Sequence, residues 1–335
     1  MNSLSIVIPY FNEFNDILQT VDKIVRAIEF VPYAEGELIV VDDGSEIPLS
    51  LDFVKMPENW SLRVINNLHK GRFQTRIDGA TKAQYRHVLF CDSRVQIESD
   101  ALIQVVSSVN EGGLAAQNGW VLAPKETKLL GLFWESFSRI FWWKAFKNDD
   151  DIIFTIDNFH QYPKGTGLLL IRRAVFLQAT QNLKSHFIET ERMSDDTLLL
   201  QRVLESSGLV LNKKIRGAYL PRVSFVSLFK NCYTRGYHAI DSFFHDFNLF
   251  AFVILVFLFS PFLAVTIGVL AGPLFVLGSI LICLISLTII AQRVMLPIRN
   301  LLCLLIYLPI MTLPYYCGLL KGLQLLSWKK LRGIK

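Results

Sequence analysis

The sequence has 335 residues, of which 52% are hydrophobic and 19% charged, a composition too apolar for an ordinary soluble protein and too charged for a pure bundle of membrane helices. All 29 acidic residues and 27 of the 34 basic residues lie in the first 248 residues, which carry a net charge of −2, whereas the remainder carries +7. The chain therefore joins two kinds of polypeptide, and disorder is excluded for the first, which is long enough to bury a full core.

The cysteines, the start of the chain and its basic end limit the possible compartments and partners. The five cysteines include no Cys-x-x-Cys pair, so neither a disulfide framework nor a zinc site is predicted. Met1–Pro9 lacks the basic start of a cleavable signal, and we expect the first part to stay in the cytoplasm. The basic excess near the end predicts contact with anionic membrane lipid and no nucleic-acid partner. Its residues are Lys321, Lys329, Lys330, Arg332 and Lys335.

In the first part, short apolar runs rich in β-branched residues alternate with segments that have the apolar spacing of helices. This alternation predicts an α/β fold with a mostly parallel sheet, covered by helices on both faces. The predicted strands are Ser3–Ile8, Glu37–Val41, His87–Cys91 and Leu168–Arg172, and the predicted helices are Gln19–Phe30, Ala101–Val109 and Asp196–Glu205.

Residues 127–160 are aromatic and irregular. Two interpretations stay open for them: a helix that packs its aromatic side on the core or on lipid, and a wall beside an acceptor substrate. Asn148–Asp151, within this stretch, predicts a solvated turn.

Each of the first three predicted strands ends in a polar cluster, at residues 9–13, 42–45 and 92–94. In an open α/β sheet, ligands bind outside the carboxyl ends of the strands, so these clusters should converge. A single carboxylate after a strand is often only a turn or helix cap, but three clusters together predict a ligand site. No phosphate-binding P-loop and no Gly-x-Gly-x-x-Gly follows the first strand, so neither ATP hydrolysis nor hydride transfer is predicted.

These residues resemble the motifs of glycosyltransferase family 2, whose members have the GT-A nucleotide-sugar fold. Residues 5–13 are similar to the opening strand and loop of the family, and residues 40–45 to its second motif, which reads the nucleotide. Residues 71–79 are similar to its Gly-x-x-x-Ala-Arg-Asn-x-Gly helix start, with Arg76 on the arginine and Ile77 in place of the asparagine. The resemblance covers about residues 3–240, and we expect residues 1–240 to form a cytoplasmic GT-A domain.

The resemblance implies a nucleotide-diphosphate sugar as donor. The residues that it assigns to the donor are Pro9, Tyr10, Asn12, Glu13, Asp42, Asp43, Ser45, Arg76, Asp92 and Arg94. Asp42 or Asp43 would accept hydrogen bonds from a base and a ribose, and Arg76 would offer its planar fork to a diphosphate or a base carbonyl.

A divalent cation, Mg²⁺ or Mn²⁺, is expected because Asp92-Ser93-Arg94 stands where the family has Asp-x-Asp. Asp92 would hold the cation, which would neutralise the departing diphosphate. Arg94 cannot ligate a metal. Either Asp92 suffices with other ligands and phosphate oxygens, or Arg94 itself supplies part of the charge stabilisation.

The catalytic base is expected at Asp195 and Asp196, which resemble the Glu-Asp pair of the family before a helix. Asp196 takes the place of the aspartate that deprotonates the acceptor hydroxyl, and a single displacement would invert the anomeric centre. Both acids also suit the N-terminus of a helix for its dipole alone. His186 is a weaker candidate.

On the acceptor side, the resemblance implies Gly165, Thr166 and Gly167 as a glycine turn. Arg235 and His238 lie where processive members carry Gln-x-x-Arg-Trp, which is missing here, so polymer synthesis is disfavoured. The two side chains would contact diphosphate or lipid phosphate, or simply anchor an interfacial loop.

Residues 241–335 predict an integral membrane region that ends in the basic tail. Leu249–Leu270 and Leu274–Ala291 have the length of membrane spans, and Ala271-Gly272-Pro273 suits a tight turn between them. A third apolar stretch, residues 301–320, either spans or forms a re-entrant or interfacial hairpin broken at Pro309 and Pro314. We favour the second alternative, because a third span would place the basic tail outside, against the positive-inside rule.

Together with this resemblance, the sequence predicts an inverting glycosyltransferase at the cytoplasmic face of a membrane, expected to be a bacterial inner membrane, acting on a lipid-linked or membrane-proximal glycan acceptor. The alternative is a catalytically silent nucleotide-sugar sensor or scaffold of a glycan assembly complex, suggested by Arg94. A transport component is disfavoured, because the spans lack acidic residues and repeated architecture.

Overall fold

The computed structural model of the chain forms two units, each described by itself. The first comprises Met1–Lys125, Lys144–Ser185 and Glu189–Pro221, and the second comprises Glu126–Trp143, His186–Ile188 and Arg222–Lys335. The residues that the structure describes within these bounds are 3–112, 115–183, 196–221, 224–244, 251–252, 254–256, 258–259, 268–269 and 272–331.

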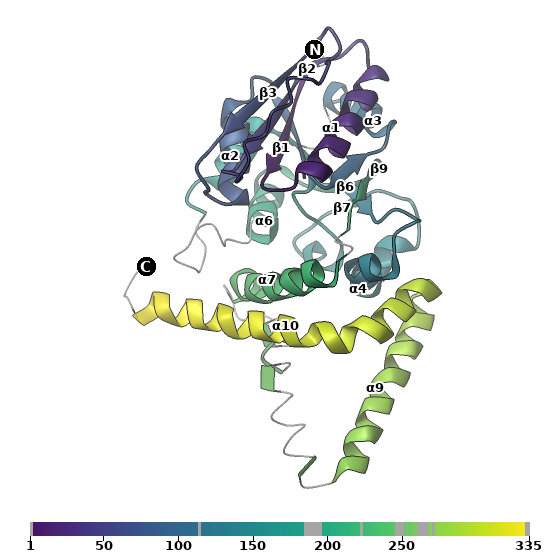
Figure 1. Cartoon of the computed structure of the whole chain (residues 1–335). Coiled ribbons are helices and arrows are strands. Elements are labelled where there is room, and N and C mark those ends of the chain that lie inside the picture. The colour runs from purple at the N-terminus through teal and green to yellow at the C-terminus, as the bar shows by residue number, and fades with distance from the viewer. Residues whose placement is uncertain are drawn as a thin grey trace. The chain divides into compact units, whose positions relative to one another are not determined.

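The first unit is built on a nine-stranded sheet (Figure 1) with the order β3-β2-β1-β4-β8-β6-β9-β5, to which β7 adds by pairing with β9. The strands are β1 (Ser3–Tyr10), β2 (Glu35–Asp42), β3 (Trp60–Asn66), β4 (His87–Cys91), β5 (Val95–Ile97), β6 (Ala116–Leu122), β7 (Ile152–Ile153), β8 (Leu168–Arg172) and β9 (Val210–Tyr219).

The predicted α/β class is confirmed, but the sheet is mixed rather than mostly parallel. β3, β2, β1 and β4 run parallel, whereas β8 is antiparallel to both of its neighbours and β9 pairs parallel with β6. Apolar strand runs are typical of any doubly covered sheet, so the pattern of residues carries no information about strand direction.

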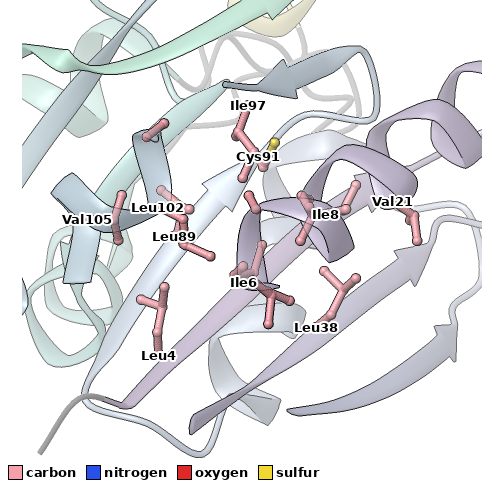
Figure 2. Close-up of a cluster of buried hydrophobic side chains, with 14 of the residues drawn as sticks. Leu4, Ile6, Ile8, Val21, Leu38, Leu89, Cys91, Ile97, Leu102 and Val105 are labelled. Carbon is pink, nitrogen blue, oxygen red and sulfur yellow. The ribbon is translucent and has the colours of Figure 1, made fainter. Parts of the chain in front are cut away.

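Helices cover both faces of this sheet. The helices of the first unit are α1 (Phe14–Glu29), α2 (Arg72–Lys82), α3 (Ala101–Asn110), α5 (Arg173–Thr180) and α6 (Asp196–Ser207). On one face, Ile6, Ile8 and Leu38 pack with Val21 of α1 and Leu102 of α3 (Figure 2).

Alternate residues of the same strands point to the other face, as the period of a strand requires. There Val7, Ile39 and Phe90 pack with Phe176 of α5 and Leu200 of α6. The apolar runs in the strands are continuous because both faces of the sheet are buried.

The first unit contains more strands than the sequence predicted. Strands β3, β5, β6, β7 and β9 were not predicted, and β1 continues through Pro9 and Tyr10, which the sequence placed after the strand. Near β9, Lys213 is 2% exposed and its Nζ donates to the carbonyl oxygens of Ala145 and Asn148, at 2.5 and 2.6 Å. Asn148–Asp151 are exposed, as expected of a solvated turn, and Asp151 also accepts from the backbone N–H of Lys213 at 2.7 Å.

The second unit is helical. Its principal described helices are α4 (Phe133–Phe141), preceded by the 3₁₀ turn η1 (Leu129–Leu132), and α7 (Phe225–Phe243), α9 (Pro273–Arg293) and α10 (Ile298–Leu331). The first half of the aromatic segment, up to Trp143, and α7 thus group with the C-terminal region, whereas the sequence placed the boundary at residue 240. They do so because both pack on α10.

Helices α9 and α10 can be compared with two predictions about the membrane region. The second predicted span corresponds to α9, and Gly272, at φ 82°, precedes its first residue, Pro273. α10 continues through Pro309 and Pro314, so the break expected at these prolines is wrong. Each proline removes one backbone hydrogen bond of the helix, while the packing of α10 on its neighbours keeps the flanking turns in place. The first predicted span lies largely outside the described residues.

By length and composition, the part of the chain that the structure describes contains one helix able to cross a membrane, Ile298–Ser327 within α10. A shorter apolar helix, Leu277–Arg293, lies within α9.

Candidate functional site

The loops after β1 and β2 are joined through Asn12. Its backbone N–H donates to Oγ of Ser45 at 2.9 Å, and its side-chain Oδ1 accepts from the backbone N–H of Glu46 at 3.0 Å. Asn12 has φ 53°, a left-handed conformation that asparagine tolerates better than most residues. The residue therefore links the first two polar clusters, and its contact with a donor stays a prediction.

Asp42 holds the loop that follows β2. Its side chain is 2% exposed and accepts hydrogen bonds from the backbone N–H groups of Ser45, at 2.9 Å, and Leu49, at 3.2 Å. Buried carboxylates require such partners. By binding two backbone N–H groups, the Asp42 carboxylate stabilises the conformation of the loop after β2.

Asp43 plays the same part toward the segment between β3 and α2. Its side chain is 3% exposed, Oδ1 accepts from the backbone N–H of Lys70 at 2.9 Å, and Oδ2 accepts from that of Gly71 at 3.0 Å. Gly71 has φ 87°, which favours glycine, and it is the N-cap residue of α2. Asp43 therefore fixes where α2 begins.

Arg76 and Asp92 bring α2 and the end of β4 together. Nη2 of Arg76 lies 2.5 Å from Oδ1 of Asp92, and the arginine side chain is 1% exposed whereas that of Asp92 is 24% exposed. The sequence predicted that Arg76 faces a diphosphate; the structure places it behind Asp92, where it orients that carboxylate. Asp92 is the member of the pair that a ligand can reach.

Gly167, at the start of β8, packs directly against Asp92. The backbone N–H of Asp92 donates to the carbonyl oxygen of Gly167 at 2.8 Å, and a Cβ atom on Gly167 would lie 3.1 Å from Oδ2 of Asp92. The side chain of Asn118 makes two hydrogen bonds with the backbone of Gly165: Nδ2 donates to the carbonyl oxygen and Oδ1 accepts from the N–H, each at 2.9 Å. Thr166 is 1% exposed. The predicted glycine turn therefore borders the same carboxylate.

Arg94 is engaged within the first unit. Nη1 lies 2.8 Å from Oδ2 of Asp16, and Nε and Nη2 donate to the carbonyl oxygen of Leu220 at 2.9 and 2.6 Å. Glu13 lies 3.8 Å from the same guanidinium and accepts from the hydroxyl of Ser93. Arg94 thus joins the start of α1 to the end of β9, and its role toward a donor stays a prediction.

Two predicted donor residues lie inside the strand. Pro9 pairs with Val41, and Tyr10 is 3% exposed within the core. Burial raises the pKa of Tyr10; a hydrogen bond with Ser45 opposes that rise, and the charges of Asp42 and Glu13 add to it.

An aromatic pair that the sequence did not single out lies beside these loops. The rings of Phe11 and His69 stack with centroids 4.5 Å apart and an interplanar angle of 28°. Phe11 is 41% exposed and the His69 side chain 47%, and Nδ1 of His69 lies 3.0 Å from Oδ2 of Asp43. The position of Phe11 directly after a strand was a signal that the sequence offered for this site. No sequence pattern pointed to His69, which stands 58 positions later.

The remaining predicted residues fall elsewhere. Asp195 and His186 lie outside the described residues, and Asp196 is the first residue of α6, with its side chain also outside them. Arg235 and His238 belong to α7 of the second unit, where the Arg235 guanidinium lies 4.3 Å from the ring centroid of Trp134.

Metal ligation rests on few groups. Among the described residues, no three histidine, cysteine or acidic side chains come together as a metal cluster. Asp92 provides one carboxylate at the strand ends, and Mg²⁺ is commonly bound by one or two carboxylates together with substrate phosphates. The site thus suits a cation that a phosphorylated ligand brings with it.

Comparisons with known proteins agree with this arrangement. Residues 5–169 match the family model described as Glycosyl transferase family 2. An undecaprenyl-phosphate 4-deoxy-4-formamido-L-arabinose transferase from Proteus mirabilis (strain HI4320) is 25% identical over 115 residues, which are 33% of this chain. The match covers 35% of that relative, about a third of its length.

Two solved structures resemble the chain. Mannosyltransferase PcManGT from Pyrobaculum calidifontis, in complex with GDP-Man and Mn²⁺, aligns with 96% of this chain and 86% of its own, with 12% identity and a TM-score of 0.56. The crystal structure of S. aureus TarS aligns with 72% of this chain and 40% of its own, with 16% identity and a TM-score of 0.45. The first of these likenesses shows the fold.

Proposed function

We propose that this chain, whose residues 5–169 belong to glycosyltransferase family 2, moves a sugar from a nucleotide-diphosphate donor to a lipid-linked acceptor at the cytoplasmic face of a membrane, with inversion. The resemblance and the enzyme class expected from the sequence, a glycosyltransferase with a GT-A-like fold, are confirmed. The observation that carries the proposal is the carboxylate of Asp92, held by Arg76 at the end of β4 beside the other strand-end loops.

The donor would lie over the carboxyl ends of β1, β2 and β4, where ligands of open α/β sheets bind. The exposed stack of Phe11 and His69 offers an aromatic face for a nucleobase. Asp42 and Asp43, which are 2% and 3% exposed, would support the donor by shaping the loops around it. The diphosphate would then reach Asp92.

A divalent cation fits this site with Asp92 as its protein ligand and the other ligands drawn from diphosphate oxygens and water. Such a cation supplies charge neutralisation of the leaving diphosphate. The Mn²⁺ in the complex of the mannosyltransferase supports the proposal by likeness of fold.

Asp196 is the proposed base, with Asp195 beside it. An acceptor hydroxyl would attack the anomeric carbon from the face opposite the diphosphate, its proton passing to the carboxylate while the bond from the anomeric carbon to the diphosphate oxygen breaks. An acceptor that is a lipid phosphate needs no base, because its oxygen is already anionic near neutral pH. The relative named for undecaprenyl phosphate makes this acceptor the first to test.

Membrane attachment is proposed from α9 and from the apolar run that precedes it. Leu274, Leu277, Ile280, Ile282 and Ile285 of α9 are each at least 50% exposed. Such a surface of aliphatic side chains is stable in hydrocarbon and unfavourable in water. The 21 residues of α9 span about 31 Å, close to the roughly 30 Å of a bilayer core.

The test is release of nucleoside diphosphate by the full chain in detergent, with a panel of donors and a membrane lipid extract, with and without Mn²⁺ or Mg²⁺. Release that Asp92→Asn abolishes and that the exposed variant Asp52→Asn retains would support the transferase. Loss in Asp196→Asn would indicate a hydroxyl acceptor, and retention a phosphate acceptor. No release from any donor with any lipid would contradict the proposal.

A second candidate is a nucleotide-sugar sensor without turnover. It is favoured by Arg94, which stands at the second acidic position of the motif and is bound to Asp16 and to Leu220. Donor binding that Asp43→Ala abolishes, together with cellular glycan unchanged by Asp196→Asn and Asp92→Asn, would favour the sensor over the enzyme.

A further inference from the structure

Helix α10 has two different faces along its length. One face is apolar and open: Ile298, Leu302, Ile306, Ile310, Leu313 and Leu320 are between 44% and 66% exposed. Their spacing of mostly three or four residues places them in one stripe, about 33 Å long. The opposite face is buried, and it includes Asn300, Cys303, Leu304, Met311 and Leu319.

Helix α7 lies against this buried face. A Cβ atom on Gly236 would lie 2.9 Å from Cα of Gly318, and one on Gly322 would lie 3.1 Å from Cα of Tyr237. Contacts of this kind require the two backbones to touch, which small residues at a helix crossing permit. Since Tyr233 meets Gly318 and Ile240 meets Gly322, the helices run in the same direction side by side (Figure 1).

Helix α7 is too polar to enter a bilayer core. Its 19 residues include Lys230, Arg235, His238 and Asp241, spread over three turns, and Asp241 is fully buried. Charged side chains at the centre of a membrane are costly and rare. Any position of α10 must therefore keep α7 out of the hydrocarbon.

The first turns of α10 are held by another polar element. Nη2 of Arg299 donates to the carbonyl oxygen of Thr127 at 2.6 Å, and Nδ2 of Asn300 donates to Oγ of Ser136 at 3.0 Å. Ser136 belongs to α4, which also carries the ion pair of Glu135 and Arg139 at 2.7 Å. α10 therefore has polar partners both at its start and in its second half.

From these contacts we infer that α10 lies in the plane of the membrane interface, with its open apolar stripe in the lipid and α4 and α7 on its aqueous side. A helix that crossed the bilayer would carry α7 into the core with it. The 34 residues of α10 extend about 51 Å, well beyond the roughly 30 Å that a span needs. The partner is the surface of an anionic bilayer, and the inference rests on the membrane attachment proposed above.

The charge of the chain agrees with this position. The last turn of α10 contains Lys329 and Lys330, and Arg332 and Lys335 follow in the sequence; basic residues beside an interfacial helix are attracted to anionic lipid. With α10 in the plane, the segments proposed to cross the membrane are α9 and, from its sequence alone, the apolar run 249–270. The basic tail then ends on the same side as residue 1, in agreement with the positive-inside rule.

Reporter fusions to the full chain test the topology. A reporter that is fluorescent only in the cytoplasm and an enzyme active only outside would each be placed after Lys335, at Met1 and within the turn at Gly272. The expected result is a cytoplasmic signal at both ends and an external signal at Gly272. An external tail would overturn the inference, as would a cytoplasmic signal at Gly272 in a protein that resists alkaline extraction from membranes. Recovery of the chain in the soluble fraction would overturn both this inference and the proposed attachment, whereas loss of transferase activity alone would leave both standing.

A matched pair of substitutions tests the depth of the helix. Leu313 near the middle of α10 and Ile282 near the middle of α9 are 63% and 65% exposed. Leu313→Arg should leave the membrane-bound fraction after alkaline washing within about twofold of the unmodified chain, because an arginine at the interface can extend to the head groups. Ile282→Arg should lower that fraction severalfold. An equal drop in both variants would place α10 in the hydrocarbon core and overturn the inference.

Discussion

Replacement of Asp43 by asparagine removes one acceptor from a buried junction. In the native chain, one carboxylate oxygen accepts from Lys70 N–H at 2.9 Å and the other from Gly71 N–H at 3.0 Å. Asparagine keeps one oxygen, and its amide nitrogen must then face a backbone N–H, so that two donors meet. The side chain is 3% exposed, so water offers little compensation.

The size of the effect follows from that loss. A hydrogen bond to a charged group and the burial of an unsatisfied N–H together correspond to about 2–4 kcal/mol. For a domain of about 150–250 residues, this should lower the melting temperature by roughly 4–16 °C. Donor affinity should fall as well, because the released segment carries His69, whose ring stacks on Phe11.

The assay is thermal unfolding of the purified full chain in detergent, followed by titration with the donor found in the screen. Asp52→Asn is the matched control, because Asp52 is exposed and accepts only from Ser50 among the contacts described, at 2.8 Å; its effect should stay below about 0.5 kcal/mol. If Asp43→Asn melted within 1 °C or so of the control, the assignment of Asp43 as the holder of this loop would be refuted.

Three further substitutions probe other contacts. Gly167→Ala should lower turnover about tenfold without changing the melting temperature, because the new Cβ, 3.1 Å from Oδ2 of Asp92, must displace that carboxylate by a few tenths of an ångström; an unchanged rate of diphosphate release would count against Asp92 as the donor-facing group. Lys213→Met should cost about 2–4 kcal/mol in thermal unfolding, because the backbone carbonyls of Ala145, which is buried, and of Asn148 lose their donor, and a variant as stable as the parent would show that these contacts contribute nothing. Gly236→Leu should separate α7 from α10 and increase protease sensitivity, whereas Gly278→Leu, which meets nothing within 4 Å, should not; equal sensitivity of the two variants would contradict the close packing of the helices.

Short apolar runs were sufficient to locate most of the strands that position the site. His87–Cys91 and Leu168–Arg172 were predicted with the bounds that the structure has, and β1 and β2 with ends one to two residues short. Strand β3 escaped because its middle residues are only half buried, so its apolar run is interrupted by Ser61 and Arg63. A fully buried strand is recognisable in the sequence as a continuous apolar run, whereas the pattern of an edge strand is weaker.

For the candidate site too, some features could be predicted from short stretches of sequence and others could not. The acids after β2 and β4 and the helix start at Gly71 stand in short motifs, and such motifs could be recognised in the sequence. What each acid does depended on partners far along the chain: Asp43 on Lys70 and Gly71, and Asp92 on Arg76. Which member of the pair of Arg76 and Asp92 a ligand can reach was decided by their exposed fractions, which can be known only from the folded chain.

By itself, the sequence determined that an α/β domain with the motifs of glycosyltransferase family 2 is joined to an apolar, basic C-terminal region, because strand periodicity, motif spacing and charge are local properties of a chain. Only the tertiary structure decided the mixed direction of the sheet, the burial of Arg76 behind Asp92, the stack of Phe11 on His69 and the packing of α7 along α10. Each of these features depends on contacts between residues that are distant in sequence. Such contacts are selected by the free energy of burying apolar groups and hydrogen-bonding polar groups in the whole fold, which no local pattern encodes.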